Sequence, residues 1–174
     1  MIENTTICAI STPPGNGAIA LIRLSGSNSL SILNKVFTPA RKSEQVLNYT
    51  ANTIHYGKVH SDGEQIDDVL VSIFRTPHSY TGEDSVEIAC HGSVHIQQRI
   101  LELLVKKGAV LAKPGEFSMR AFMNGKMDLS QAEAVADLIA SGSSASHKLA
   151  VQQMRGDFSE ALNNLRSRLL NLSS

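Results

Sequence analysis

The spacing of apolar residues changes at Pro114-Gly115, and this change constrains the fold more than any other feature of the sequence. Before it, apolar residues form short continuous or alternating runs, the pattern of β-strands, with a few helical stretches between them. After it, they recur every three or four residues, as on one face of an α-helix. The sequence therefore predicts mixed strands and helices over the first two thirds and helices alone over the last third.

Runs rich in β-branched and other apolar residues predict six strands, over residues 5–11, 18–25, 53–60, 66–74, 85–91 and 110–112. Ser61-Asp62-Gly63 separates two of these strands, so we expect a β-hairpin there. Segment 18–25 contains so many Ile, Leu and Ala residues that we expect it to be buried on both faces. Residues 38–52 are mainly polar and predict a loop.

Helical spacing predicts five helices, over residues 29–37, 93–107, 117–123, 130–142 and from about 145 onward. Ser27 or Asn28 can cap the first and Ser93 the second, and Ser130 opens a sequence that fits a capping box. The last helix carries an apolar seam for packing on another helix, made of Phe158, Leu162, Leu165, Leu169 and Leu172. We expect this helix to continue in a longer protein; a natural C-terminal helix packed on its own domain is the alternative.

Gly15, Gly17 and Ala20 form the pattern G-x-G-x-x-A, which is typical of a dinucleotide-binding turn. That turn works only when a helix begins at the second glycine, so that free N–H groups meet a pyrophosphate. Here a predicted strand follows, and residues 34–40 contain no acidic residue to bind a ribose. We therefore expect these glycines to make a tight connection between two strands.

The charge balance and the cysteines restrict the class of protein. The chain carries 16 basic and 16 acidic residues, whereas dedicated nucleic-acid-binding proteins usually have a basic excess. Cys8 and Cys90 lie in apolar runs and predict buried thiols in a reducing cytosol. The N-terminus lacks the features of a signal peptide, and no apolar run approaches the roughly 18 residues of a membrane span. We expect a cytoplasmic protein without membrane contact.

Arg23 and Glu87 are charged residues inside apolar predicted strands, where an unpaired buried charge is unfavourable. Arg23 shares one face of its strand with Ile19, Leu21 and Ser25. Glu87 shares a face with Ser85, Ala89 and His91, and such small or polar neighbours leave room for a ligand. Two interpretations remain open, a ligand pocket and a structural ion pair inside the sheet.

Lys126 follows the helix stop Asn124-Gly125, so we expect it in a corner between two helices. Taken alone, it is typical of a solvated loop lysine. A metal site is not expected in the neighbourhood of the strand at 85–91, because no fourth ligand has a matching spacing to Cys90, His91 and His95. The sequence also lacks the P-loop pattern, since Gly125-Lys126 is followed by methionine.

Four ordered segments resemble the N-terminal part of the bacterial tRNA modification GTPases of the MnmE (TrmE) family: TPPGNGAIALIRLSG, SYTGEDSVEIACHG, KPGEFSMRAFMNGKMDLSQAEAVADLIAS and GDFSEAL. The resemblance covers essentially the whole chain. It implies an α+β domain over residues 1–118, with a mixed or antiparallel sheet and flanking helices, similar to the folate-binding domain of aminomethyltransferases. Residues 119–174 then correspond to the first helices of an α-helical domain.

The resemblance also implies function. The family's domain forms a homodimer and binds a tetrahydrofolate derivative, 5-formyl- or 5,10-methylene-tetrahydrofolate, and its contacts fall on Arg23, Glu87 and Lys126. No catalytic or metal-binding residue is implied in this chain. GTP, Mg2+ and K+ belong to a GTPase domain that is absent from this sequence. With the flavoprotein MnmG (GidA), the full-length proteins add an aminomethyl-type group at C5 of wobble uridine 34 of tRNA.

Other interpretations stay open beside this one. A stand-alone folate-dependent enzyme similar to aminomethyltransferases needs an acid or base near the folate and a second substrate domain. A helical dimerisation scaffold needs no working folate site. The neutral net charge predicts that this chain by itself binds tRNA weakly, because phosphate contacts require an excess of Lys and Arg.

Overall fold

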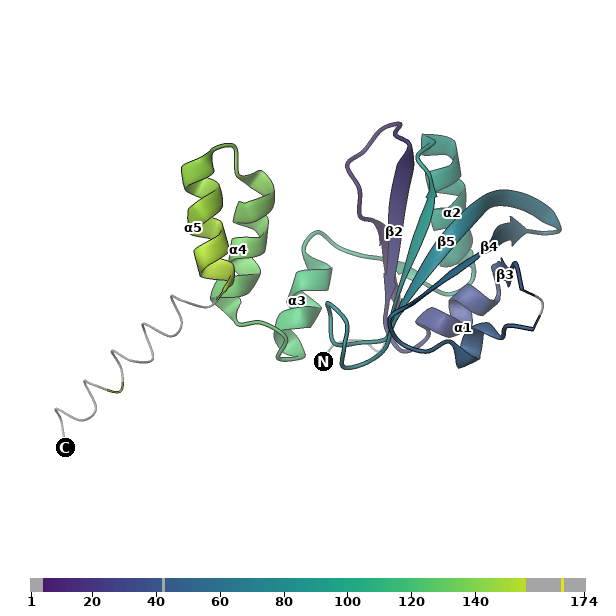
Figure 1. Ribbon diagram of the computed structural model, residues 1–174, viewed down its shortest axis with the longest axis horizontal. Helices are drawn as coiled ribbons and strands as arrows, with labels where there is room; N and C mark the ends of the chain where they lie inside the picture. Colours follow the sequence, from purple (N-terminus) through teal and green to yellow (C-terminus); the bar gives the residue numbers. More distant parts are fainter. Residues whose placement is uncertain (1–4, 42, 156–166, 168–174) are drawn as a thin grey trace. The chain divides into compact units, whose positions relative to one another are not determined.

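The computed structural model describes residues 5–41, 43–155 and 167 (Figure 1). It consists of two compact units, Met1–Phe117 and Ser118–Ser174, and each is described here by itself. The first unit contains the whole sheet and the second is helical. Strands interleaved with helices, followed by helices alone, are the α+β arrangement expected from the sequence.

A mixed seven-stranded sheet forms the first unit, in the order β3-β4-β5-β6-β2-β1-β7. Neighbouring strands are antiparallel, except that β1 and β7 are parallel. The six predicted strands are all present, with boundaries that differ by a few residues or not at all. The strands are β1 (Ile7–Ile10), β2 (Ile19–Ser25), β3 (Phe37–Pro39), β4 (Thr53–Ser61), β5 (Glu64–Phe74), β6 (Ser85–His91) and β7 (Val110–Leu111).

Two helices, α1 (Ser29–Asn34) and α2 (Val94–Lys106), pack on one face of this sheet (Figure 1). Their buried side chains, such as Leu33 and Leu104, belong to the same core as the inward-facing residues of the central strands. In β2 the inward residues are Ala20, Ile22 and Leu24, and in β6 they are Val86, Ile88 and Cys90. Because side chains alternate along a strand, Arg23 and Glu87 lie on the opposite face.

The opposite face carries exposed apolar side chains. Ile19 in β2 is 69% exposed and Ile54 in β4 is 67% exposed, and Tyr56 and Leu70 are about half exposed. The prediction that segment 18–25 is buried on both faces is therefore wrong. The core of the first unit covers one face of β2 only, so apolar composition alone did not reveal which side of the strand is buried.

The connections between strands follow from their glycines. Asp62 and Gly63 both have positive φ, 51° and 87°, as a two-residue hairpin turn requires, and this confirms the predicted hairpin of β4 and β5. Residues 11–18 connect antiparallel β1 and β2, so the glycines there do link two strands, through a loop rather than a tight turn. Gly17 donates a hydrogen bond to the carbonyl of Gly92, and a Cβ on Gly92 would collide with the Gly17 carbonyl.

Residues 38–52 depart from the predicted loop. The short strand β3 reaches Pro39, and a 3-10 turn, η1 (Val46–Asn48), follows it. The strand pairs with β4 where Gly57 lies against the ring of Phe37. Because β3 has only three residues and includes a proline, its own sequence carries almost no strand signal.

The second unit contains α4 (Leu129–Ala140) and α5 (Ser144–Met154), which pack side by side in antiparallel directions (Figure 1). The unit begins within α3 (Glu116–Met123). The capping box of α4 is formed by Asp128 and Gln131, not by Ser130, so the predicted cap was displaced by two residues. No helix in the described segments is both long and apolar enough to cross a bilayer. The predicted seam lies outside the described residues: Phe158, Leu162, Leu165, Leu169 and Leu172.

Candidate functional site

The centre of the candidate site is an ion pair between neighbouring strands. Arg23 of β2 and Glu87 of β6 are directly opposite each other in the antiparallel register. Arg23 donates from Nε and Nη2 to the same oxygen, Oε1 of Glu87, over 2.9 Å and 2.7 Å. The two side chains are 24% and 20% exposed, so solvent still reaches the pair. The structure therefore brings together the two strand charges that the sequence singled out.

The pair does not use its full hydrogen-bonding capacity. Both bonds end on Oε1, and within the described part of the chain Glu87 Oε2 and Arg23 Nη1 take no hydrogen-bond partner. A fork-to-fork pair would instead have engaged both oxygens and two guanidinium nitrogens. One acceptor and one donor thus remain on an accessible face, which suits a polar ligand as well as an ion pair of the sheet.

Two aromatic rings flank the guanidinium of Arg23. Its central carbon is 5.2 Å from the ring centre of Tyr80 and 5.6 Å from that of Phe117, within the range of a cation–π contact. Neither ring was predicted as part of the site. The signal for Tyr80 was its place in the otherwise polar loop before β6, where a large aromatic residue has no obvious core to join.

Beyond the ion pair, the same face of β2 ends in a buried cluster of hydroxyl groups. Ser25 is fully buried; its Oγ donates to Oε2 of Glu83 over 2.7 Å. Since that bond uses its only proton, Ser25 accepts at 2.6 Å from Thr81, which is also buried. This cluster connects the loop that carries Tyr80 to the strand that carries Arg23.

Lys126 lies in the second unit, just after the end of α3. Its backbone N–H donates to the carbonyl of Ala121, and Gly125 before it has φ of 68°, as in a glycine-terminated helix end. The side chain is exposed, as predicted for an interhelical corner. Its grouping with Arg23 and Glu87 stays a prediction, because those residues belong to the first unit.

Cys8, Cys90 and His91 are held by the fold of the first unit. Burial raises the pKa of both Cys8 and Cys90 to about 11, so both thiols stay protonated at neutral pH. His91 contacts the buried carboxylate of Asp67, which accepts from its backbone N–H over 2.8 Å and lies 2.7 Å from its Nδ1. Among the described residues, no three Cys, His, Asp or Glu side chains are grouped to hold a metal ion.

Comparison with protein families gives two adjacent matches. Residues 6–126 match the family described as GTP-binding protein TrmE N-terminus. Residues 129–174 match the MnmE helical domain. The first match includes all three candidate residues: Arg23 and Glu87 of the first unit and Lys126 of the second.

Individual relatives agree with the family matches. The chain is 56% identical over 173 residues to the tRNA modification GTPase MnmE of Bacteroides fragilis, covering 99% of this chain and 37% of that protein. It is 53% identical over 174 residues to the protein of the same name from Flavobacterium johnsoniae, covering 100% and 37%. For the one from Porphyromonas gingivalis, identity is 49% over 168 residues, covering 97% and 35%. The chain thus spans little more than a third of the length of these relatives.

Proposed function

This chain belongs to the family of the GTP-binding protein TrmE N-terminus, and from that membership we propose that it is the folate-binding, dimerising part of a tRNA-modifying GTPase. The observation that carries this proposal is the Arg23–Glu87 pair, with its remaining acceptor and donor beside two aromatic rings. The ligand is a tetrahydrofolate derivative, 5-formyl- or 5,10-methylene-tetrahydrofolate.

The chemistry of a pterin matches the groups that the pair presents. The 2-amino-pyrimidinone edge offers two adjacent N–H donors, which a carboxylate accepts most strongly when each of its oxygens takes one. Oε1 of Glu87 is engaged by Arg23, so we expect one of the two bonds that Arg23 donates to it to be exchanged on binding. Arg23 and Lys126 are the cations available for the ring carbonyl, the formyl oxygen or the glutamate carboxylates.

The exposed apolar face of the sheet supports the homodimer. Ile19, Ile54, Tyr56 and Leu70 come from three strands of one face, and several exposed apolar side chains on one face are typical of an interaction site. Arg23 and Glu87 share that face. A second copy of the chain is the partner that we propose for it.

The remaining functions belong to a longer protein. Because the chain spans 37% of its relatives and its sequence has no P-loop, we place GTP, Mg2+ and K+ in the portion outside these residues. We propose that the full-length protein acts in the cytoplasm with the flavoprotein MnmG (GidA) and adds an aminomethyl-type group at C5 of the wobble uridine of tRNA. With no net charge, this chain alone is expected to contribute little tRNA affinity.

Isothermal titration with 5-formyl-tetrahydrofolate tests the folate site. We expect Glu87→Gln to weaken binding by about 10- to 100-fold, because a charge-assisted hydrogen bond contributes roughly 1.5–3 kcal/mol. The matched control is Glu64→Gln, which removes an exposed carboxylate that pairs with Arg99 at 3.1 Å and is expected to leave the affinity unchanged. Equal affinity of Glu87→Gln and the unsubstituted chain would refute the assignment.

A further inference from the structure

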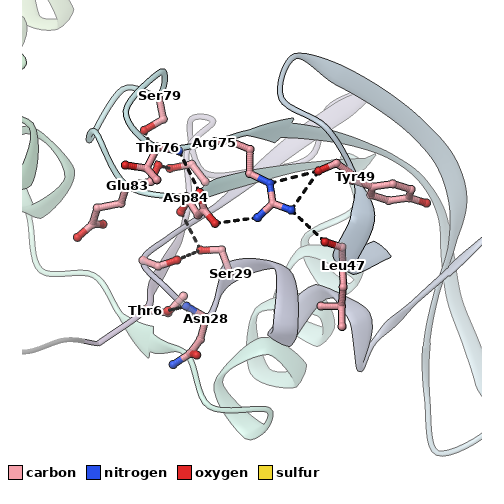
Figure 2. Close-up of polar contacts among 12 residues, drawn as sticks. Thr6, Asn28, Ser29, Leu47, Tyr49, Arg75, Thr76, Ser79, Glu83 and Asp84 are labelled. Atoms are coloured by element: carbon pink, nitrogen blue, oxygen red, sulfur yellow. Dashed lines mark hydrogen bonds and ion pairs between the residues drawn. The ribbon is translucent and has the colours of Figure 1, made fainter. Parts of the chain in front are cut away.

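The loop of residues 75–84, which we call the β5–β6 loop, is fixed at its base by Arg75 (Figure 2). The guanidinium of Arg75 donates to the carbonyl of Tyr49 from Nε and Nη2, over 3.2 Å and 3.1 Å. It also donates from Nη2 to the carbonyl of Leu47 over 3.0 Å and from Nη1 to Oδ2 of Asp84 over 2.9 Å. One side chain therefore binds the start of the loop to its end and to η1.

Asp84 completes this base from the other end of the loop (Figure 2). Its second carboxylate oxygen, Oδ1, accepts from the backbone N–H of Thr76 over 2.9 Å. Its backbone carbonyl accepts from the N–H of Gly26 and from Oγ of Ser29, both over 3.0 Å. The first and last residues of the loop are thus joined to each other and to the start of α1. We call the Arg75–Asp84 pair the loop base.

Hydrogen bonds between its own residues also join the rest of the loop above this base. Thr76 Oγ1 donates to the carbonyl of Gly82 over 2.8 Å, and Ser79 Oγ donates to the carbonyl of Glu83. Tyr80 lies between these bonded positions in the sequence, and its ring covers the guanidinium of Arg23. The neighbouring Thr81 is bound to Ser25 of the Arg23 strand. These bonds connect the loop base, through the loop, to the ring that lies over Arg23.

We propose that Arg75 and Asp84 are positioning residues, which act through Tyr80 to hold the guanidinium of Arg23 in its direction toward the folate ligand. The part of this proposal that concerns the folate ligand rests on the function proposed above. Among the described residues, no hydrogen bond or ion pair joins Arg75 to Arg23 or Glu87, so its effect on them passes through the loop. Arginine suits this position, because its planar guanidinium donates to Leu47, Tyr49 and Asp84 from three separate nitrogens.

The first test needs no ligand. In the 174-residue chain, the NMR signal of the Arg23 Nε–H reports the ring current of Tyr80, and Tyr80→Leu gives the size of that contribution. We expect Arg75→Gln to shift the Arg23 signal in the same direction as Tyr80→Leu, by at least half as much. The control is Arg99→Gln, which breaks a surface ion pair of the same unit with Glu64 and is expected to leave the Arg23 signal in place.

An unchanged Arg23 signal in folded Arg75→Gln overturns the proposal. If Arg75→Gln does not fold, Asp84→Asn replaces it, since the amide oxygen can still accept from Thr76 while the carboxylate charge that faces Arg75 is lost. Failure of both variants to fold also overturns the proposal, because the loop base is then a requirement of the fold rather than of the site. Thermal unfolding of each variant decides between these outcomes.

The second test measures affinity for 5-formyl-tetrahydrofolate in a double-mutant cycle. We expect Arg75→Gln and Tyr80→Leu each to weaken binding by about tenfold, and the double variant to bind no more weakly than Tyr80→Leu alone. Independent, multiplying losses overturn action through Tyr80. If the unsubstituted chain binds no folate, the proposed function fails, whereas the NMR experiment still decides whether the loop base positions Tyr80 over Arg23.

Discussion

Single residues of the sheet show how a charge is accommodated in apolar surroundings. Arg23 and Glu87 were expected to have either each other or a ligand as partner, and they have each other while keeping one polar atom each for a further contact. Asp67 is buried without a neighbouring cation on its own strand, and it is satisfied by the backbone and ring of His91. A buried carboxylate is tolerated when N–H donors face it, and here they come from another strand.

The pKa values of buried groups predict how stability depends on pH. Burial raises the pKa of Cys8 and Cys90 to about 11 and also raises that of Tyr49, whose phenol lies beside Glu44. A raised pKa means that the folded state favours the protonated form. The stabilisation is complete below the unfolded pKa, near 9 for the thiols, and is lost as pH rises through about 11. We expect the free energy of unfolding, from urea titrations, to fall steadily above pH 9.

A thiol-reactive chromogenic disulfide checks the same burial at pH 8. We expect neither cysteine to react in the native protein within minutes and both to react at once in guanidinium chloride. Cys8→Ser and Cys90→Ser identify which thiol accounts for any reaction. Rapid reaction of either thiol in the folded protein would contradict its burial.

Elements that carry their own periodicity were predictable, and those defined by a partner were not. Strand β6 and the β4–β5 hairpin follow from alternation and from Asp62-Gly63, and both are confirmed. Strand β3 depends on pairing with β4, a contact between segments that the local sequence does not encode. For the candidate site, the polar positions Arg23 and Glu87 could be read from the strand pattern. Tyr80 could not, because its contact with Arg23 is created by a loop.

Replacement of Gly57 tests the packing of β3 on β4. A Cβ at this position would overlap the carbonyl oxygen of Thr38 and lie 2.5–2.6 Å from ring carbons of Phe37. We expect Gly57→Ala to lower the free energy of unfolding by about 1–3 kcal/mol, because the strand must move to relieve the overlap. Gly142→Ala is the control, since a Cβ there meets nothing within 4 Å. Chemical unfolding of both variants measures the difference, and a Gly57→Ala protein as stable as the unsubstituted chain would contradict this account.

At the scale of the whole molecule, the first unit has one covered and one exposed sheet face. The covered face packs against α1 and α2, and the other presents Ile19 and Ile54, each more than 60% exposed. Composition did not distinguish the two faces, because both contain Ile and Leu. Only the placement of the helices decides which of them is the core.

Sedimentation velocity tests whether a second copy covers the exposed face. We expect the chain to sediment as a dimer and Ile54→Lys to shift it to the monomer, because a charge would be buried in the interface. Leu47→Lys is the matched control, since Leu47 is also an exposed apolar residue but lies in η1, outside this face. A monomeric unsubstituted chain, or a dimer that Ile54→Lys leaves intact, would contradict this assignment of the interface.

The parallel pairing of β1 with β7 has a consequence for biosynthesis. Val110 donates to the carbonyl of Thr6 and Ala112 to that of Cys8, so the strand made first is bordered by the strand made last. The ribosome must therefore translate almost the entire first unit before β7 can pair with the free edge of β1. Until then the nascent polypeptide exposes the unpaired edge of β1, which can aggregate with other chains. A chaperone or rapid elongation would protect this edge.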